Sequence, residues 1–284
     1  SIMMAAMYTT YSLVNNSYSQ VVDRAKISRS GRDVVEMIIR DVRMAGFHYF
    51  AGENTLNIPL SNYLQYIGGT GAVSIQESHD PLIVKRNTLG YNGVGSSAAT
   101  PEKHDTTRDK CCDRIHIVYG DFDIAGMNET PKQPYKKYRI TYFARALSKG
   151  GDQYYGLYRS KESWIQPLNP LTDSSFGQWK FDCPECYEGE LVREYLTDMS
   201  FAAIGKYGEI IKADPVLNAD KIYDIRSVDV TLTFRSSAKK GFYRNLTGKP
   251  RIIKSLVREA FEFTDKFLRD TIFVTVHTRN IGSI

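Results

Sequence analysis

Apolar residues recur at steps of three and four through residues 1–47, the spacing that lines one face of an α-helix. The repeat runs through Met4, Tyr8, Tyr11, Val14, Tyr18, Val22 and Ala25, and resumes after a polar interval at Val35, Ile38, Val42 and Ala45. No proline interrupts it; Gly31 is a candidate for a bend and Gly46 for the C-terminal stop. The pattern predicts a helix about 70 Å long, so its first half extends past a compact domain and needs another partner.

From Ala51 onward the periodicity falls to two, which is typical of β-strands. Alternating apolar residues predict strands at 115–119, 138–142, 154–159, 228–234 and 272–277. Lys149-Gly150-Gly151-Asp152 has the composition of a turn that joins the second and third of these strands as a hairpin. Residues 51–81 and 87–110 are expected to form long loops, and residues 251–268 a mixture of strand and loop.

These elements predict an α+β fold in which the long N-terminal helix packs on antiparallel sheets with long loops. We divide the chain into a helical segment, residues 1–47, and a β-rich globular domain, residues 48–284. A cluster of prolines at Pro167, Pro170 and Pro184 suggests a boundary between two sheet lobes near residues 160–190.

The composition is that of an ordinary folded protein, with 42% hydrophobic and 24% charged residues in a chain of 284. Aromatic residues make up 12%, including 19 tyrosines, which suits half-buried strands. The net charge of +5 is small for a dedicated nucleic-acid binder. No run of about 18 apolar residues is present that would span a membrane.

The chain begins with an unusually apolar stretch, residues 1–7, which has no charged residue. We interpret it as the end of a longer hydrophobic segment that preceded Ser1. The alternative is a first helical turn that is buried in the protein's own core.

The motifs of nucleophilic, phosphate-binding and metal-dependent enzymes are missing from the sequence. The five histidines show no metal-ligand spacing, and His116 and His277 lie inside predicted strands, where a structural role is expected. The sequence therefore predicts a protein that is not an enzyme and needs no cofactor.

Four cysteines form two pairs, the adjacent Cys111-Cys112 and the C-x-x-C of Cys183 and Cys186. We expect disulfides that join one pair to the other, which would close loops of about 70 residues and stabilise the fold by roughly 4 kcal/mol each. A Cys₄ zinc site, free thiols or closure within the C-x-x-C are the alternatives. Disulfides would indicate an oxidising compartment.

Two further segments can each be interpreted either as a ligand-binding site or as a solvent-exposed turn or loop. Asp121 and Asp123 stand where an oxygen-ligand calcium loop carries its first ligands, but Ala125 breaks the pattern, so we favour a solvated turn. A basic stretch at residues 239–258 includes Phe242 and Tyr243, a composition that can bind single-stranded nucleic acid. We favour a solvated loop there too.

Four segments resemble PilW-type minor pilins of type IV pili. Arg40-Asp41-Val42-Arg43-Met44-Ala45-Gly46-Phe47 resembles the end of their N-terminal helix, and Thr275-Val276-His277-Thr278-Arg279-Asn280 their final strand. Tyr138 to Arg159 resembles the strand–turn–strand before their variable loops, and Met3 to Val14 the lower part of their membrane helix. The middle of the chain, residues 51–110 and 160–220, matches only in general character.

The resemblance implies a pilin-like fold and a structural role in the tip complex that primes pilus assembly. Met4, Met7, Tyr8, Tyr11 and Val14 would then contact neighbouring subunits in the filament. Implied partners are other minor pilins, the major pilin, a tip adhesin, and the inner membrane through the segment before Ser1; nucleic acid is not expected. The protein would reside in the bacterial inner membrane and periplasm before assembly, and at the extracellular pilus tip afterwards.

One departure from the family concerns the mature N-terminus, where members carry Thr-Leu-Ile-Glu and an apolar run. The glutamate used in filament packing has no counterpart in this chain. Two alternatives stay open: a GspJ-like minor pseudopilin of a type II secretion system, and a secreted module that binds a surface ligand or DNA.

Overall fold

The computed structural model describes residues 2–47, 81–86, 88–89, 103–104, 111–122, 124–128, 135–165, 178–181, 189–212, 219–237, 248–257 and 260–281. One long helix, α1 (Ile2–Met44), precedes a series of strands and two short 3₁₀ turns, η1 (Ala125–Asn128) and η3 (Ala219–Asp224). The strands are β1 (Leu82–Lys85), β2 (Thr88–Leu89), β3 (Lys103–His104), β4 (Arg114–Phe122), β5 (Tyr135–Lys149), β6 (Asp152–Ile165), β7 (Gln178–Phe181), β8 (Glu190–Gly205), β9 (Ile210–Ile211), β10 (Ile225–Arg235), β11 (Arg251–Ile253), β12 (Phe261–Phe263) and β13 (Arg269–His277).

The predicted helix is confirmed as a single uninterrupted element of 43 residues. Gly31, the candidate for a bend, lies inside the continuous helix. Gly31 instead allows close packing, because a Cβ at this position would lie 2.4 Å from Cδ1 of Ile272 on β13. Gly46 follows the last turn with a φ of +73°, as expected for a glycine that ends a helix.

Most strands form one sheet of 11 strands, with the main order β1-β4-β5-β6-β8-β10-β13. Neighbours along this order are antiparallel, and β5 and β6 form the predicted hairpin. A second, two-stranded sheet pairs β11 with β12, in agreement with the strand and loop mixture predicted for residues 251–268. All five predicted strands are present.

Among the described strands, β1, β2, β3, β7, β8 and β9 were not predicted. The 16-residue β8 pairs with both β6 and β10 and lies in the middle of the sheet. The short strands β2 and β3 interrupt the loop that was predicted over residues 87–110. The other predicted loop, residues 51–81, lies outside the described part of the chain apart from Pro81.

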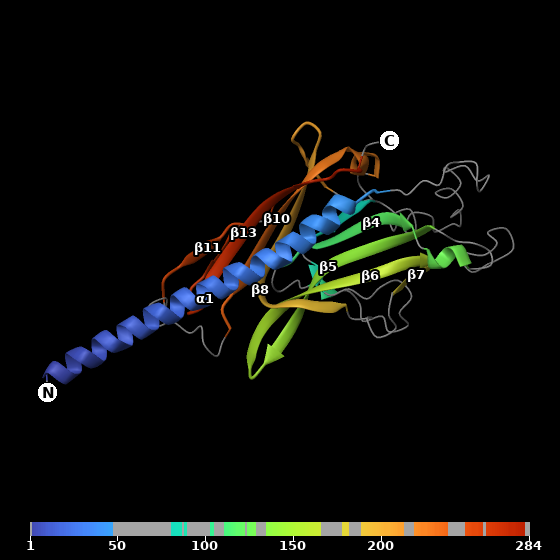
Figure 1. The fold of residues 1–284 in the computed structure, drawn as a ribbon. Helices are drawn as coiled ribbons and strands as arrows, with labels where there is room; N and C mark the ends of the chain where they lie inside the picture. Colours follow the sequence, from blue (N-terminus) through green and yellow to red (C-terminus); the bar gives the residue numbers. More distant parts are fainter. Residues whose placement is uncertain are drawn as a thin grey trace.

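The helix and the sheet share one hydrophobic core (Figure 1). The C-terminal part of α1 contributes Val34, Ile38 and Val42, which pack among inward-facing residues of the central strands. In Figure 1, α1 crosses one face of the sheet and its N-terminal part continues beyond the strands. The α+β fold class, a long N-terminal helix packed on an antiparallel sheet, is therefore confirmed. The division into units at residue 47 and into two sheet lobes stays a prediction.

The C-terminal end of α1 is closed by residues far away in the sequence. Asn280 donates a hydrogen bond from Nδ2 to the carbonyl of Arg43 at 3.1 Å. The amide of Gly46 donates to the carbonyl of Val118 on β4 at 2.9 Å, and the side chain of Ile281 packs near Gly46. The bond from Asn280 satisfies one of the carbonyl groups that a helix leaves without a partner at its C-terminal end.

Candidate functional site

The N-terminal half of α1, residues 2–26, is a surface with little contact to the rest of the protein. It contains most of the large hydrophobic side chains that the structure exposes, namely Ile2, Met3, Met4, Met7, Tyr8, Tyr11, Leu13, Val14, Tyr18 and Val21. We call residues 2–26 the distal half and residues 27–44 the proximal half of α1. The distal half alone is about 37 Å long. Isolated exposed hydrophobic residues are normal, but a continuous group of this size marks an interaction surface.

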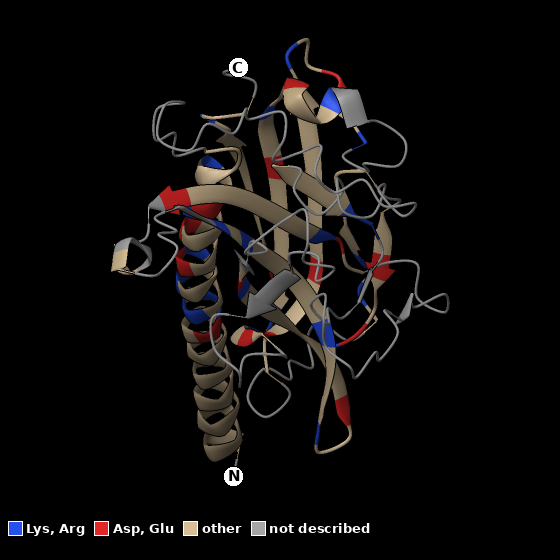
Figure 2. Cartoon of the chain, turned by 90° about the vertical axis from the view of Figure 1, so that its right-hand side faces the viewer, with Lys and Arg blue, Asp and Glu red and all other residues tan. Residues whose placement is uncertain are grey.

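Charge is absent from most of this surface, since no Asp, Glu, Lys or Arg occurs before Asp23. Figure 2 shows the lower part of α1 free of charged residues and its upper part banded with both signs. No helix in the described part of the chain is long and apolar enough to be a candidate membrane span. As far as Val22, the distal half is thus a mixture of apolar and uncharged polar side chains.

Several of these polar side chains are bonded to the helix itself. Thr9 and Thr10 donate hydrogen bonds from Oγ1 to the carbonyl of Ala6, at 2.8 and 2.9 Å. Ser12 donates from Oγ to the carbonyl of Thr9 at 2.9 Å. Hydroxyls that bond back to the preceding turn need fewer external partners. The distal half can therefore be covered by an apolar surface at a lower desolvation cost than its composition suggests.

The proximal half holds α1 in place by packing. Its buried residues are Ile27, Gly31, Val34, Val35, Ile38, Asp41 and Val42, which lie on one side of the helix. Gly31 lies against Ile272 of β13. The helix therefore passes from solvent into the core at Ile27.

Asp41 is an acidic residue on this otherwise apolar face. Its Oδ2 accepts a hydrogen bond of 2.6 Å from the Tyr142 hydroxyl and one of 2.9 Å from Nε of Arg159. Burial, followed by the proximity of Asp41, raises the pKa of Tyr142 above its ordinary value. Because Tyr142 lies on β5 and Arg159 on β6, the Asp41 carboxylate connects α1 to two strands.

Arg193 of β8 fixes the point at which the helix leaves the core. Its Nη1 donates a hydrogen bond of 3.1 Å to the carbonyl of Ile27, and its guanidinium lies 4.0 Å from the ring centroid of Phe234. Burial lowers the pKa of Arg193 to about 10, partly offset by Asp270 and Asp33, so the side chain is cationic at neutral pH. A charge-assisted hydrogen bond at this point holds the direction in which the distal half projects.

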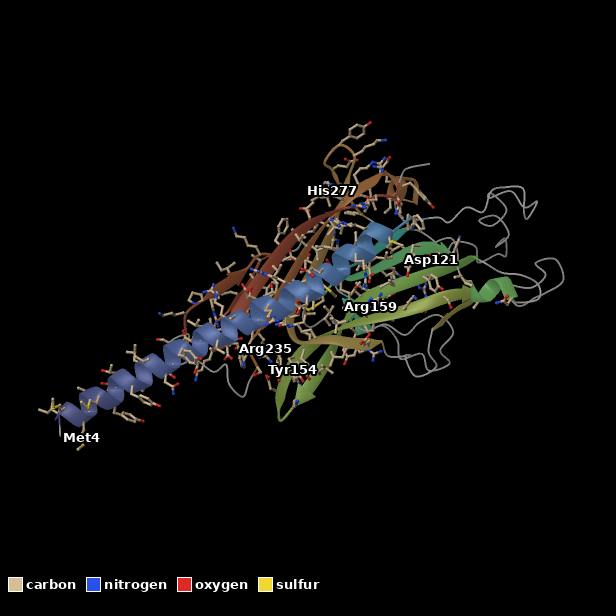
Figure 3. The ribbon with its side chains drawn as sticks, in the orientation of Figure 1. Met4, Asp121, Tyr154, Arg159, Arg235 and His277 are labelled. Carbon is tan, nitrogen blue, oxygen red and sulfur yellow. A yellow bond between two sulfur atoms is a disulfide. The ribbon has the colours of Figure 1, made fainter. Side chains whose placement is uncertain are left out.

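The five residues predicted to contact neighbouring subunits all lie on the distal half. Met4, Met7, Tyr8, Tyr11 and Val14 expose between 61% and 80% of their surface. Figure 3 shows Met4 at the free end of the helix, away from the strands. The alternative of a buried first turn is wrong, because Ile2 is 86% exposed. The contact with other subunits stays a prediction.

The cysteine pairing differs from the expectation. The structure joins Sγ of Cys111 to Sγ of Cys112 as a disulfide between adjacent residues, just before β4. Cys183 and Cys186 lie outside the described residues, so their pairing and the four-cysteine zinc alternative stay open. The correction concerns Cys111 and Cys112, which are bonded to each other and not to two separate partners.

Cys111, Cys112 and Asp198 form the group of potential metal ligands identified in the described part of the chain. Their ligand atoms lie within 4.8 Å of one another and all three residues are buried. Metal binding by cysteine requires thiolates, and the disulfide removes both. In the oxidised form this group is therefore a covalent link and not a metal site.

The candidate calcium loop is only partly described. Asp121 is exposed near the end of β4, where its backbone pairs with Lys136 of β5. Figure 3 places it far from Met4. Asp123 lies outside the described residues, so the choice between a calcium site and a solvated turn stays as predicted.

Sequence reasoning missed the residues that orient the helix. Asp41 falls at the helical spacing set by Ile38 and Val42, and a single acid in an apolar repeat was a usable signal. Arg193 lies on the unpredicted β8 and gave no signal. The role of Gly31 depends on Ile272, more than 200 residues later, and could not be derived from local pattern.

Comparisons with known proteins give a distant likeness in structure. No family model matches the chain, and no curated protein matches its sequence. Among solved structures the chain is similar to the type IV-like pilin TTHA1219 from Thermus thermophilus, at 9% identity and a TM-score of 0.38, over 89% of this chain and 96% of that one. The likeness is too distant to indicate a function, and the function proposed below depends on the geometry of α1.

Proposed function

We propose that this chain is a structural subunit of a type IV pilus, specifically a PilW-type minor pilin of the tip complex that primes assembly. It acts by packing the distal half of α1 among the helices of other subunits, and it has no catalytic role. The observation that carries the proposal is a largely apolar helical segment, uncharged as far as Val22, that extends about 37 Å beyond the domain that anchors it.

The physical argument rests on the contrast between exposure and anchoring. An amphipathic surface helix has its apolar residues toward its own core, whereas a helix that is apolar on several sides is buried in an assembly or membrane. On the distal half, Met3, Met4 and Leu13 point in directions about 80° or more apart and all are exposed. A single neighbour covers one side only, so several neighbouring helices are expected around this segment.

The chemistry of the side chains fits a surface that changes its surroundings. Methionine adapts its shape to different neighbours, and tyrosine combines an apolar ring with a polar hydroxyl. Such residues suit a helix that lies near lipid headgroups before assembly and among protein helices afterwards. In this proposal the partners are other minor pilins and the major pilin, and the route runs from the inner membrane and periplasm to the cell surface.

The test places charges on the distal half without touching the core. The variant Met7→Asp/Tyr11→Asp/Tyr18→Asp is expected to fold normally, because all three side chains are exposed. It should fail to restore surface pili in cells that lack the native gene. The matched control, Ile124→Asp/Tyr207→Asp/Ile252→Asp, puts the same charges on exposed hydrophobic positions of the strand region.

The proposal requires the control to restore pili and the helix variant to abolish them. Normal piliation with the helix variant would contradict it, provided that circular dichroism shows both variants folded. The GspJ-like alternative predicts the same loss in secretion through a type II system instead of in pili, so both readouts are measured in the same cells.

A further inference from the structure

A single exposed stripe runs along nearly the whole of α1 on the side away from the sheet. Its members follow one another at steps of three or four residues, and every one is exposed. The outer stripe consists of Met7, Tyr11, Val14, Tyr18, Val21, Ala25, Arg29, Arg32, Glu36, Arg40 and Arg43. It is about 54 Å long.

The direction of the stripe follows from the buried residues of the proximal half. Arg29 follows the buried Ile27 by two residues and Arg40 follows Ile38 by two, a rotation of about 200° around the helix. The stripe therefore points away from the sheet. The steps average about 3.6 residues, the period of the α-helix itself, so the stripe keeps one direction along the whole helix.

The stripe changes chemistry where α1 meets the domain. From Met7 to Ala25 it carries no charge, and from Arg29 to Arg43 it carries four arginines and one glutamate. The charged bands on the upper part of α1 in Figure 2 belong to this half. Within the described part of the chain, Arg40 is the member of this group that forms an ion pair, with Asp41 at 3.4 Å, and its side chain is still 70% exposed. The proximal part of the stripe thus presents an excess of three positive charges to a partner.

We propose that the outer stripe docks lengthwise, in parallel, on the long helix of a different subunit, which is apolar opposite Met7–Ala25 and acidic opposite Arg29–Arg43. The proposal rests on the proposed function, since it requires that the distal half packs against other helices. It adds that one neighbouring helix is parallel to α1, belongs to a different kind of subunit and is acidic along part of its length.

The parallel orientation follows from the two halves of the stripe. An antiparallel neighbour of the same design would place arginines against the apolar half, where desolvation of charge is costly. The arginines between Arg29 and Arg43 extend over about 21 Å. The arginine part of the stripe therefore still faces the acidic part of the partner helix after any axial shift smaller than that.

The charge of the partner follows from the excess of arginine. A second copy of this chain would bring its own four arginines alongside, and juxtaposed like charges oppose association. An acidic helix would gain several exposed ion pairs, each contributing modestly but together selecting the partner. The stripe is therefore a specificity device that disfavours self-association and favours a heterologous neighbour.

The test uses an acidic copy of this chain as the probe for the partner's chemistry. The full-length variant Arg29→Glu/Arg32→Glu/Arg43→Glu keeps the apolar half and reverses the charged half. Association of the fluorescently labelled wild type with this variant is measured by sedimentation and energy transfer at about 20 mM and about 500 mM salt. The wild type alone and the variant alone are measured under the same conditions.

A matched control has the same net charge but an unchanged stripe. Lys149→Glu/Lys249→Glu/Lys254→Glu alters three exposed lysines of the strand region. We expect the wild type to bind the stripe variant roughly ten-fold more tightly than it binds itself or the control at low salt. This preference should disappear at high salt, and energy transfer should be strong only when the labels lie at the same end of both helices.

Each other outcome overturns the proposal. Equal, salt-insensitive binding of all pairs would show that the apolar half associates without regard to charge, which leaves the proposed function intact. Equal binding of the control would indicate general attraction between oppositely charged proteins. Absence of association in every mixture would show that the stripe does not dock a complementary helix, and the piliation assay would then decide the proposed function separately.

Discussion

The two halves of α1 are built from the same helical backbone and have opposite relations to the protein. In the proximal half, Val42 is fully buried and Asp41 binds two strands. In the distal half, Val14 is 61% exposed although it is the same residue type. The comparison teaches that a single unbroken helix can belong to the core along one half and leave its large apolar side chains exposed along the other. Substitutions that are identical in chemistry should therefore have opposite consequences in the two halves.

The largest contrast is expected from the same substitution at two valines. Val42→Ala removes two methyl groups from the core and should lower the free energy of unfolding by about 2–3 kcal/mol. Val14→Ala should change it by less than about 0.5 kcal/mol, since the site is exposed and alanine favours the helix. Urea denaturation followed by circular dichroism measures both. Equal losses would show that the distal half is part of the core.

The next contrast concerns the polar anchor of the proximal half. Tyr142→Phe removes the hydroxyl that donates to Asp41 and leaves a buried carboxylate with one fewer partner. The free energy of unfolding should fall by about 1–3 kcal/mol. Tyr18→Phe, which removes the same hydroxyl from the exposed half, serves as control and should be neutral. A neutral Tyr142→Phe would mean that packing alone holds the helix.

Alkaline pH provides a third way to separate the halves. Burial, followed by the negative charge of Asp41, raises the pKa of Tyr119 to about 12, and the pKa of Tyr142 is raised for the same reasons. The unfolded chain releases these protons near pH 10 while the folded chain keeps them. Stability should fall between pH 10 and 12 by up to about 1.4 kcal/mol per pH unit for each tyrosine.

Chemical denaturation at pH 9, 10 and 11 measures this slope. Tyr142→Phe should remove the contribution of one tyrosine to the dependence of the free energy of unfolding on pH. Removal of residues 2–20 should leave this dependence unchanged. A slope that depends on the distal half would contradict the assignment of stability to the proximal half.

The smallest effect is expected at Gly31. Alanine here would improve helix propensity by up to about 1 kcal/mol, but its Cβ would lie 2.4 Å from Cδ1 of Ile272. We expect the gain to appear only in the Ile272→Ala background, where the contact is relieved. A double-mutant cycle by thermal unfolding should give a coupling near 1 kcal/mol. Additive effects would show that the close approach does not matter.

The sequence predicted those elements in which one face is buried and the other is not. The helix was visible because its apolar residues kept a helical step, and the strands around Ile117, Ile140 and Val230 because apolar and polar residues alternate. β8 was missed for a physical reason: from Leu196 to Ala203 every residue is buried, so the alternation disappears. Its leucine, alanine and glutamate also favour a helix in isolation.

The position of the candidate site along the chain could be predicted, but the contacts that hold α1 on the sheet could not. The uncharged stretch before Asp23 and its large apolar residues are a property of the sequence itself. How the helix is held depends on Arg159, Arg193 and Ile272, which lie more than 100 residues away and meet α1 only in the folded chain. The pairing of Cys111 with Cys112 was likewise not among the alternatives weighed, since spacing alone gives no preference among pairings.

The closure of α1 by Asn280 has a consequence for the order of events during biosynthesis. The two bonded residues are separated by 237 positions, so a ribosome has released most of the polypeptide before this contact can form. Contacts of such long range are slow to establish. Until they form, the apolar distal half of α1 is exposed on the nascent chain while the C-terminal segment has not yet been synthesised. An early-binding chaperone or a bilayer that shelters the leading end would then protect the chain from premature aggregation.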